Sequence, residues 1–295
     1  MKKLLPVFLA LLLLTACAPH SETVMESQEV PEPAFSLPET SDAEPVSAEA
    51  IVTEGRAPAE DYDLPVPQEF SPEQSYMRYN MDDWIRSGTV GILAESPDGN
   101  AAFYGLPFPA DGQGGHETAL IRWGDSLAEF DWYFVTPRMY LPQMAVMDLD
   151  GDGEDELVIM TYYGSGTGAS AYELHVLEKN PDGTLTDYAM PEKLWQEQIP
   201  PLLQYVSTDG RNFLILGREL VEISPEQIPP VIPEEHLNVS TGFIANFRLL
   251  PEENAVQFLG AVDLGGIAHY VAEYTANVGY QDGVFTLSDF HLNAY

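Results

Sequence analysis

Residues 148–160 read "DLDGDGEDELVIM", an acidic, glycine-containing loop that runs directly into an apolar stretch with the length of a β-strand. Counted from Asp148 as position 1, side-chain oxygens fall at alternate positions, on Asp148, Asp150 and Asp152. Gly153, at position 6, permits a sharp turn. Carboxylates placed this closely repel one another unless a cation neutralises them. The pattern is typical of the opening of a calcium-binding loop, in which a hard cation takes about six to eight oxygen ligands.

The loop closes differently from the helical calcium motifs. An EF-hand requires a bidentate glutamate at position 12, and that position is Ile159 here, inside the apolar stretch. We expect Glu156, at position 9, to supply the closing carboxylate and Glu154, at position 7, to supply its backbone carbonyl. The alternative is a solvated acidic turn that binds no metal.

The same residues resemble a known family. The stretch "AVMDLDGDGEDELVIM", residues 145–160, resembles the FG-GAP/VCBS calcium loop of integrin-type β-propellers, in which one apolar strand leads in and another leads out. The resemblance implies that Ca²⁺ is held by the side chains at positions 1, 3, 5 and 9 and by the carbonyl at position 7, which are Asp148, Asp150, Asp152, Glu156 and Glu154. A single copy of the loop is found, and the longer stretch 120–180 also resembles uncharacterised lipoproteins of Firmicutes.

Short runs rich in aromatic and β-branched residues continue on both sides of the loop. Their length and composition predict strands at 89–94, 101–105, 118–123, 127–135, 156–163, 171–179, 211–220, 255–264 and 284–290. Asp-Gly pairs, which supply the positive φ angles of two-residue hairpin turns, recur at 98–99, 182–183, 209–210 and 282–283. One short helix is expected at 192–198. Residues 76–295 are therefore predicted to form one all-β domain of antiparallel meanders, propeller-like or a sandwich, with at most one or two short helices.

The N-terminal end resembles the leader of a bacterial lipoprotein. Two lysines precede an apolar run, residues 4–14, that is too short to span a bilayer with margin. The tetrapeptide LTAC at 14–17 resembles a lipobox, whose cysteine is acylated and becomes the first residue after cleavage. We expect residues 1–16 to be a signal peptide and lipidated Cys17 to anchor the chain, extracytoplasmically, to the bacterial cell membrane. The alternative is an ordinary secretory signal with a chance cysteine.

Residues 17–75 differ in composition from the rest of the chain. From residue 18 to residue 75 there are 14 acidic residues, one basic residue (Arg56) and nine prolines, and the few apolar residues follow no period. Such a segment cannot bury enough apolar surface to offset its conformational entropy. We expect a disordered, acidic tether between the lipid and the folded domain.

The charge of the chain excludes one class of partner. Removing Lys2 and Lys3 with the leader leaves 10 of the 12 basic side chains against 47 acidic ones, a formal net charge of −37. A surface this acidic repels nucleic acid and anionic lipid head groups and attracts cations. The expected partners are the membrane, through the lipid, and an extracellular protein or glycan.

No catalytic motif is visible in the sequence. The six histidines are scattered without metal-ligand spacing, no nucleophile motif is present, and Cys17 is the only cysteine. The stretch "WGDSLAEFDWYF" holds Trp123, Trp132 and Tyr133, which can stack on a sugar ring, although alternating aromatics more often pack in a core. The leading interpretation is a surface-anchored, calcium-stabilised binding or structural module. The alternatives are a carbohydrate-binding protein and a hydrolase whose site residues are distant in sequence.

Overall fold

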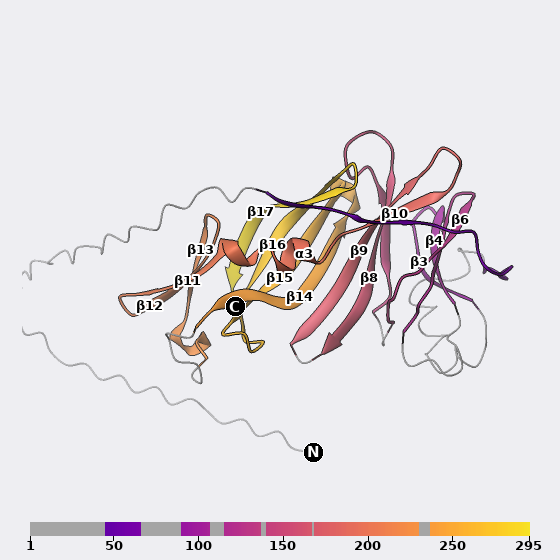
Figure 1. Cartoon of the computed structure of the whole chain (residues 1–295). Helices are drawn as coiled ribbons and strands as arrows, with labels where there is room; N and C mark the ends of the chain where they lie inside the picture. The colour runs from indigo at the N-terminus through magenta and orange to yellow at the C-terminus, as the bar shows by residue number, and fades with distance from the viewer. Residues whose placement is uncertain (1–44, 66–89, 107–114, 137–139, 167, 230–236) are drawn as a thin grey trace, which may run out of the picture. The chain divides into compact units, whose positions relative to one another are not determined.

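The computed structural model describes residues 45–65, 90–106, 115–136, 140–166, 168–229 and 237–295 (Figure 1). These residues form three β-sheets, and the all-β prediction is confirmed. The described part has one α-helix, α3 (Lys193–Gln196), within the stretch predicted to be helical. It also has short 3-10 helices: η2 (Pro200–Leu202), η3 (Pro225–Gln227) and η5 (Pro251–Glu253). No helix in this part has the length and apolar character needed to cross a membrane.

The largest sheet has ten strands. They are β1 (Val46–Glu49), β2 (Ile51–Glu54), β7 (Gln143–Met147), β8 (Glu156–Gly166), β9 (Ala169–Lys179), β10 (Leu185–Ala189), β14 (Val239–Leu250), β15 (Ala255–Leu264), β16 (Tyr270–Gln281) and β17 (Val284–Ala294). Neighbouring strands follow the order β1-β17-β16-β15-β14-β9-β10-β2, and β8, followed by β7, branches off at β9. All these pairs are antiparallel except β9 with β14, which run parallel over a short stretch.

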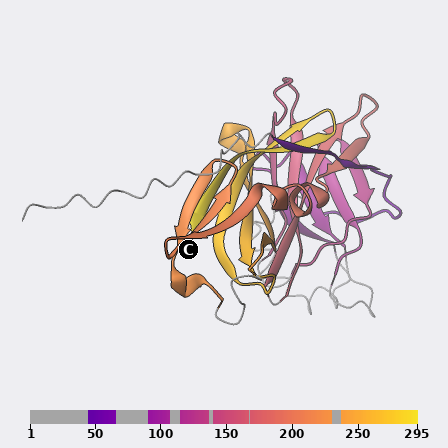
Figure 2. The same ribbon diagram turned by 60° about the vertical axis from the view of Figure 1, so that its left-hand side comes forward.

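Residues 46–54 nearly close this sheet into a barrel. β1 pairs with β17, and after Ala50 the chain continues as β2, which pairs with β10. Figures 1 and 2 show this segment in indigo, crossing from one strand to the other. One continuous segment therefore joins the two ends of the strand order.

The position of this segment corrects the predicted boundary between the tether and the folded domain. Residues 45–65 belong to the folded domain, whereas the composition placed all of 17–75 in a disordered tether and began the domain at residue 76. Composition is a poor guide here because β1 and β2 bury few side chains of their own and obtain backbone partners from β17 and β10. The predicted signal peptide, the lipidation site and the remaining tether lie outside the described residues: 1–16, Cys17, 17–44 and 66–75.

Two smaller antiparallel sheets complete the described domain. The four-stranded sheet contains β3 (Gly91–Glu95), β4 (Ala101–Gly105), β5 (Ala119–Trp123) and β6 (Ser126–Phe130), in chain order. The three-stranded sheet contains β11 (Leu203–Thr208), β12 (Arg211–Leu216) and β13 (Glu219–Ile223), also in chain order. Both are meanders of the expected kind.

β8 separates two hydrophobic cores. Val158 and Met160 contribute to a core shared with the curled part of the large sheet, α3 and the three-stranded sheet. Leu157 and Ile159 pack in a second core against the four-stranded sheet. The unbroken apolar run of β8 follows from this burial on both faces. The four-stranded sheet packs against the large sheet through this second core, and the large sheet itself is barrel-like and nearly closed.

The four Asp-Gly pairs lie at hairpin turns, as predicted. They connect β3 to β4, β9 to β10, β11 to β12, and β16 to β17, and each of their glycines has a positive φ. The run at 211–220 is two strands rather than one, because the chain turns at Gly217. Strands that the sequence does not predict include β10, β11, β14 and β16.

Candidate functional site

The acidic loop connects β7 to β8. These strands pair antiparallel, with Met147 opposite Glu156 at the mouth of the loop. Gly151 and Gly153 have φ angles of 78° and 95°, in the left-handed region that glycine adopts without a steric penalty. The predicted sharp turn is therefore present, and both glycines contribute to it.

Each of the three aspartates folds back onto the loop backbone. Asp148 Oδ1 accepts a hydrogen bond from the Gly151 N–H (2.9 Å), and Asp150 Oδ1 accepts one from the Asp152 N–H (3.0 Å). Asp152 Oδ1 accepts one from the Glu154 N–H (2.7 Å). Such side-chain-to-backbone bonds favour a tight turn and hold the carboxylates along the loop.

Asp148, Asp150 and Glu156 bring carboxylate oxygens within 4.8 Å of one another. Two oxygens that both bind one Ca²⁺ at about 2.3–2.6 Å are separated by no more than about 5 Å, so this group fits a single ion. An all-oxygen donor set also suits a hard divalent cation better than a soft one. The residues present therefore fit the ion that the loop resemblance implies.

Glu156 is the buried member of this group, with 4% of its surface exposed. Its Oε2 accepts a hydrogen bond from the Leu149 N–H at 2.7 Å. The pKa of Glu156 is raised to about 7, mainly by burial, with the charges of Asp150 and Asp152 adding to the effect and the Leu149 N–H opposing it. A cation among these oxygens favours the charged carboxylate instead.

Asp152 and Glu154 lie outside this group of three. Both side chains are exposed, and the Asp152 carboxylate bonds to the Glu154 N–H. The prediction for Glu154 involves only its backbone carbonyl, so exposure of its side chain is compatible with that role. Of the five predicted ligand residues, the structure brings together the side chains of three.

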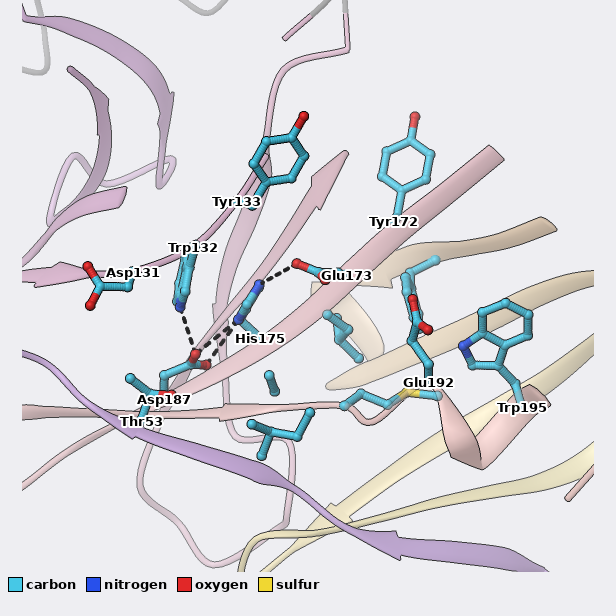
Figure 3. A pocket seen from close by; sticks show the side chains of 15 residues that line it. Thr53, Asp131, Trp132, Tyr133, Tyr172, Glu173, His175, Asp187, Glu192 and Trp195 are labelled. Carbon is cyan, nitrogen blue, oxygen red and sulfur yellow. Dashed lines mark hydrogen bonds and ion pairs between the residues drawn. The ribbon is translucent and has the colours of Figure 1, made fainter. Parts of the chain in front are cut away.

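A second feature lies beside β9 and β10. A hollow of about 230 Å³ is lined there by aromatic rings and charged side chains, which include Trp132, Tyr133, Tyr172, Glu173, His175 and Asp187 (Figure 3). Thr53 of β2 also lines it. Thr53 lies within residues 17–75, so part of the lining comes from the segment that was predicted to be a disordered tether.

His175 and Asp187 form a buried pair in the lining of this hollow. His175 Nδ1 lies 3.1 Å from Asp187 Oδ2 and 3.2 Å from Oδ1. Trp132 donates its Nε1–H to Asp187 Oδ2 at 2.8 Å, and its ring stacks on the imidazole with centroids 3.8 Å apart. His175 and Asp187 are only 3% and 1% exposed. Water therefore stabilises their charges little, and each charge is stabilised mainly by the other.

The other ring nitrogen of His175 has no hydrogen-bond partner among the described residues. Nε2 lies 3.8 Å from Glu173 Oε2, which is too far for a hydrogen bond. Burial by itself lowers the pKa of His175, but the carboxylates of Asp187 and Glu173 outweigh it and raise the pKa to about 9. The raised pKa favours the imidazolium form of His175, and Figure 3 shows that the Nε2 side of its ring is turned toward the Glu173 carboxylate.

Sequence reasoning does not find this pair. His175 and Asp187 are 12 residues apart and match no catalytic or metal-binding motif. The sequence feature that could have located them is the Asp-Gly turn at 182–183, because a two-residue turn fixes the register of the β9–β10 hairpin. That register places Ala189 opposite His175 and Leu177 opposite Asp187, so both charged side chains lie on one face of the hairpin.

The aromatic stretch at 123–134 divides between core and surface. Trp123 is buried in the core of the four-stranded sheet, as the core-packing alternative expects. Trp132 is also buried, but it lines the hollow and binds Asp187. Tyr133 is 46% exposed and lines the hollow as well. Only part of this stretch is therefore available to a ligand.

The acidic loop and the hollow are carried by neighbouring strands. β8, which begins at Glu156, pairs with β9, which carries His175. The loop offers carboxylate oxygens, and the hollow is lined by aromatic and charged side chains, so these are the two candidate binding features among the described residues. No family model, no curated protein and no solved structure matches this chain.

Proposed function

We propose that this chain is an extracytoplasmic, membrane-anchored binding module whose β-domain is stabilised by Ca²⁺. The observation that supports it is the buried carboxylate of Glu156, placed within 4.8 Å of oxygens of Asp148 and Asp150. A buried carboxylate beside two others is unfavourable by itself and becomes favourable around a divalent cation. In this proposal an acylated Cys17 supplies the anchor.

One Ca²⁺ is bound by the side chains of Asp148, Asp150, Asp152 and Glu156 and by the backbone carbonyl of Glu154. Calcium is favoured over magnesium because a flexible ring of protein oxygens suits the larger ion and leaves few places for the waters that magnesium retains. The role of the ion is structural. It fixes the connection between β7 and β8, and β8 lies between the two cores of the domain.

Calcium is expected to raise the thermal stability of the full chain, and Asp150→Ala is expected to remove most of that gain. Binding to the folded state alone contributes about 2.7 kcal/mol when the free ion is at ~100 times its dissociation constant. Extracellular modules commonly bind calcium with dissociation constants of roughly 10⁻⁴ to 10⁻³ M. Thermal unfolding in calcium, in magnesium and in chelator measures the effect, and calorimetry measures the heat of binding.

Asp155→Ala is the matched control. Asp155 is an exposed acidic residue of the same loop and lies outside the group of three carboxylates. This variant should therefore keep the calcium response of the unmodified chain. Equal melting temperatures in calcium and in chelator, with no heat of binding, would show that the loop is only an acidic turn.

Replacing Cys17 with serine is expected to release the chain from the membrane fraction or to block its processing. Serine is similar in size but offers no thiol for the acyl chain, and the lipid is the proposed anchor. Fractionation of cells that produce the unmodified chain, the Cys17→Ser chain and a Ser21→Ala control chain measures the change. The anchor is contradicted if the Cys17→Ser chain is processed normally and still sediments with membranes.

A further inference from the structure

The hollow beside His175 adjoins a second, larger one. The second has a volume of about 440 Å³ and shares Tyr133, Glu192 and Trp195 with the first. Small-molecule sites commonly have volumes of about 300–1,000 Å³, so the second hollow alone has room for an organic ligand. We call the two hollows, with the residues that line them, the aromatic groove.

The aromatic groove carries more negative charge than positive charge. The ionisable side chains among its described lining residues, apart from tyrosines, are four carboxylates and one imidazole, without a lysine or an arginine: Asp131, Glu173, Asp187, Glu192 and His175. Arg56, which does not line the groove, pairs with Asp131 at 2.6 Å. Among the described residues, the imidazolium of His175 is then the only counter-charge for the other three carboxylates. Three negative charges against one positive charge leave two of them unmatched.

The unmatched charges lie at Glu173 and Glu192. Figure 3 shows the imidazole of His175 between the carboxylates of Asp187 and Glu173. Nδ1 lies 3.1 Å from Asp187 Oδ2, and Nε2 lies 3.8 Å from Glu173 Oε2, so the single positive charge is closer to Asp187. The side chain of Glu173 is 33% exposed and lines the first hollow, so its charge faces the space that a ligand would fill. Glu192 is exposed, lines both hollows and accepts a hydrogen bond only from the neutral amide of Gln196, at 3.1 Å.

These two carboxylates separate a cationic ligand from a neutral one. A neutral ligand that covers Glu173 and Glu192 removes water from two charges and supplies no counter-charge, which costs free energy. An ammonium group supplies the missing charge, and because it is a donor without acceptors it needs only carboxylate oxygens and ring faces around it. Two donors of the lining are also closed to a sugar hydroxyl. His175 Nε2 is buried and turned toward Glu173, and the Trp132 Nε1–H is bonded to Asp187.

The exposed rings of the groove favour a cation as well. Tyr133 and Tyr163 both line the second hollow, are 46% and 45% exposed, and lie with ring centroids 5.5 Å apart and planes at 71°. Rings at this angle form a corner rather than the single flat platform on which a sugar ring stacks. The face of an aromatic ring is negative and attracts a cation within about 6 Å of its centre. A metal ion prefers oxygen ligands to rings, whereas an organic ammonium ion also packs its alkyl groups against them.

We propose that the aromatic groove binds an organic ammonium ion. The ammonium group lies among the carboxylates of Glu173 and Glu192 and the rings of Tyr133 and Tyr163, and its alkyl groups pack against these rings. This inference rests on the proposed function as a binding module and does not depend on the calcium loop.

The test is a titration of the full chain with choline and with putrescine, up to millimolar concentrations, with calcium present to fill the acidic loop. Each cation is compared with a neutral analogue of the same shape. In one analogue a tert-butyl group replaces the trimethylammonium group of choline, and in the other two hydroxyl groups replace the amines of putrescine. Calorimetry measures the affinity, and tryptophan fluorescence gives a second readout because Trp132 and Trp195 line the groove. We expect at least one of the cations to bind, and its neutral analogue to bind about tenfold more weakly or not at all.

Three variants test the residues that surround the ammonium group. Glu173→Gln and Glu192→Gln each remove one charge and keep the size of the side chain. Each should weaken binding of the cation about tenfold, as expected for losing a hydrogen bond to a charged group. Tyr163→Ala should weaken it about threefold or more, as expected for losing an exposed ring that faces a cation.

Glu253→Gln and Tyr295→Ala are the matched controls, because they change exposed residues of the same types that do not line the groove. A chain this acidic attracts any cation at long range, and the controls measure that contribution. They should leave the affinity unchanged. Equal weakening by Glu253→Gln and by Glu173→Gln overturns the proposal, and so does equal affinity for a cation and its neutral analogue. Failure of both cations to bind overturns it as well.

Titrations in calcium and in chelator separate this proposal from the preceding one. Calcium stabilisation without binding of either cation overturns only the ammonium site. Binding of a cation in the groove without any response to calcium contradicts only the proposed role of the metal ion. Unfolding midpoints of the five variants show that each remains folded under the conditions of the titration.

Discussion

Replacing Asp187 with alanine is expected to lower the free energy of unfolding by about 3–5 kcal/mol, the range for removing one partner of a buried ion pair. Asp187 is 1% exposed and accepts hydrogen bonds from His175 Nδ1 and Trp132 Nε1. Without the carboxylate, His175 must give up its proton or remain a buried cation whose charge only Glu173, 3.8 Å from Nε2, offsets. The indole N–H also loses its acceptor. Chemical denaturation at neutral pH measures the loss.

Two further variants define what the Asp187 carboxylate contributes. Asp187→Asn keeps the size of the side chain and an acceptor for Trp132 but removes the charge, so its effect should be smaller than that of alanine. Asp61→Ala changes an exposed aspartate and should alter the stability by no more than about 0.5 kcal/mol. Exposed ion pairs contribute up to about 1 kcal/mol to the free energy of unfolding. A decrease smaller than this for Asp187→Ala would show that His175 and Asp187 do not act as a buried ion pair.

The same pair makes stability depend on pH. The pKa of His175 rises from 6.5 as the ordinary value to about 9 in the folded domain, because Asp187 and Glu173 outweigh the effect of burial. The folded state holds this proton more tightly, so the stabilisation is fully present below pH 6.5 and is lost as the pH rises through 9. Asp187→Asn should flatten this part of the stability curve, measured with calcium present throughout.

Removing residues 18–54 is expected to lower the free energy of unfolding by at least about 4 kcal/mol and to promote aggregation. β1 and β2 contribute four residue pairs each to the large sheet. A hydrogen bond of such a ladder contributes about 0.5–1.5 kcal/mol, and the low end of that range gives the expected loss. The deletion also uncovers the edges of β17 and β10, which can then pair with other chains.

A chain that lacks only residues 18–44 is the control for this deletion. It keeps Cys17, β1 and β2, and it should unfold at the same denaturant concentration as the full chain. Denaturation curves and light scattering of the two shortened chains measure stability and aggregation side by side. If both chains are equally stable, β1 and β2 contribute nothing to the domain and its sheet is closed in some other way.

Local signals in the sequence predict much of the fold. The Asp-Gly turns and the apolar run at 156–163 depend on residues a few positions apart, and each lies where it is predicted. β1 and β2 are strands only because β17 and β10, far along the chain, provide their partners. β14 and β16 include Gly242 and Gly279, which weaken a strand signal, and pairing on both sides overrides that local preference.

The two candidate sites differ in the same respect: one is built from residues close in sequence and the other from residues far apart. The carboxylates of the acidic loop are close in sequence, so their spacing predicts that the side chains of Asp148, Asp150, Asp152 and Glu156 converge. The structure groups three of them and leaves Asp152 outside. The hollow beside His175 is assembled from β2, the residues after β6, the β9–β10 hairpin, α3 and β14. No spacing in the sequence relates Tyr133 to His175, because only the folded sheets bring them together.

The closing segment, residues 46–54, also fixes an order of events during synthesis. It leaves the ribosome before any strand with which it pairs, and it finds its last partner only when β17 has been made. Nearly the whole domain must therefore exist before its earliest strands are in place. Pairings between such distant parts of a chain form slowly. A growing chain therefore cannot complete this barrel before β17 has been made.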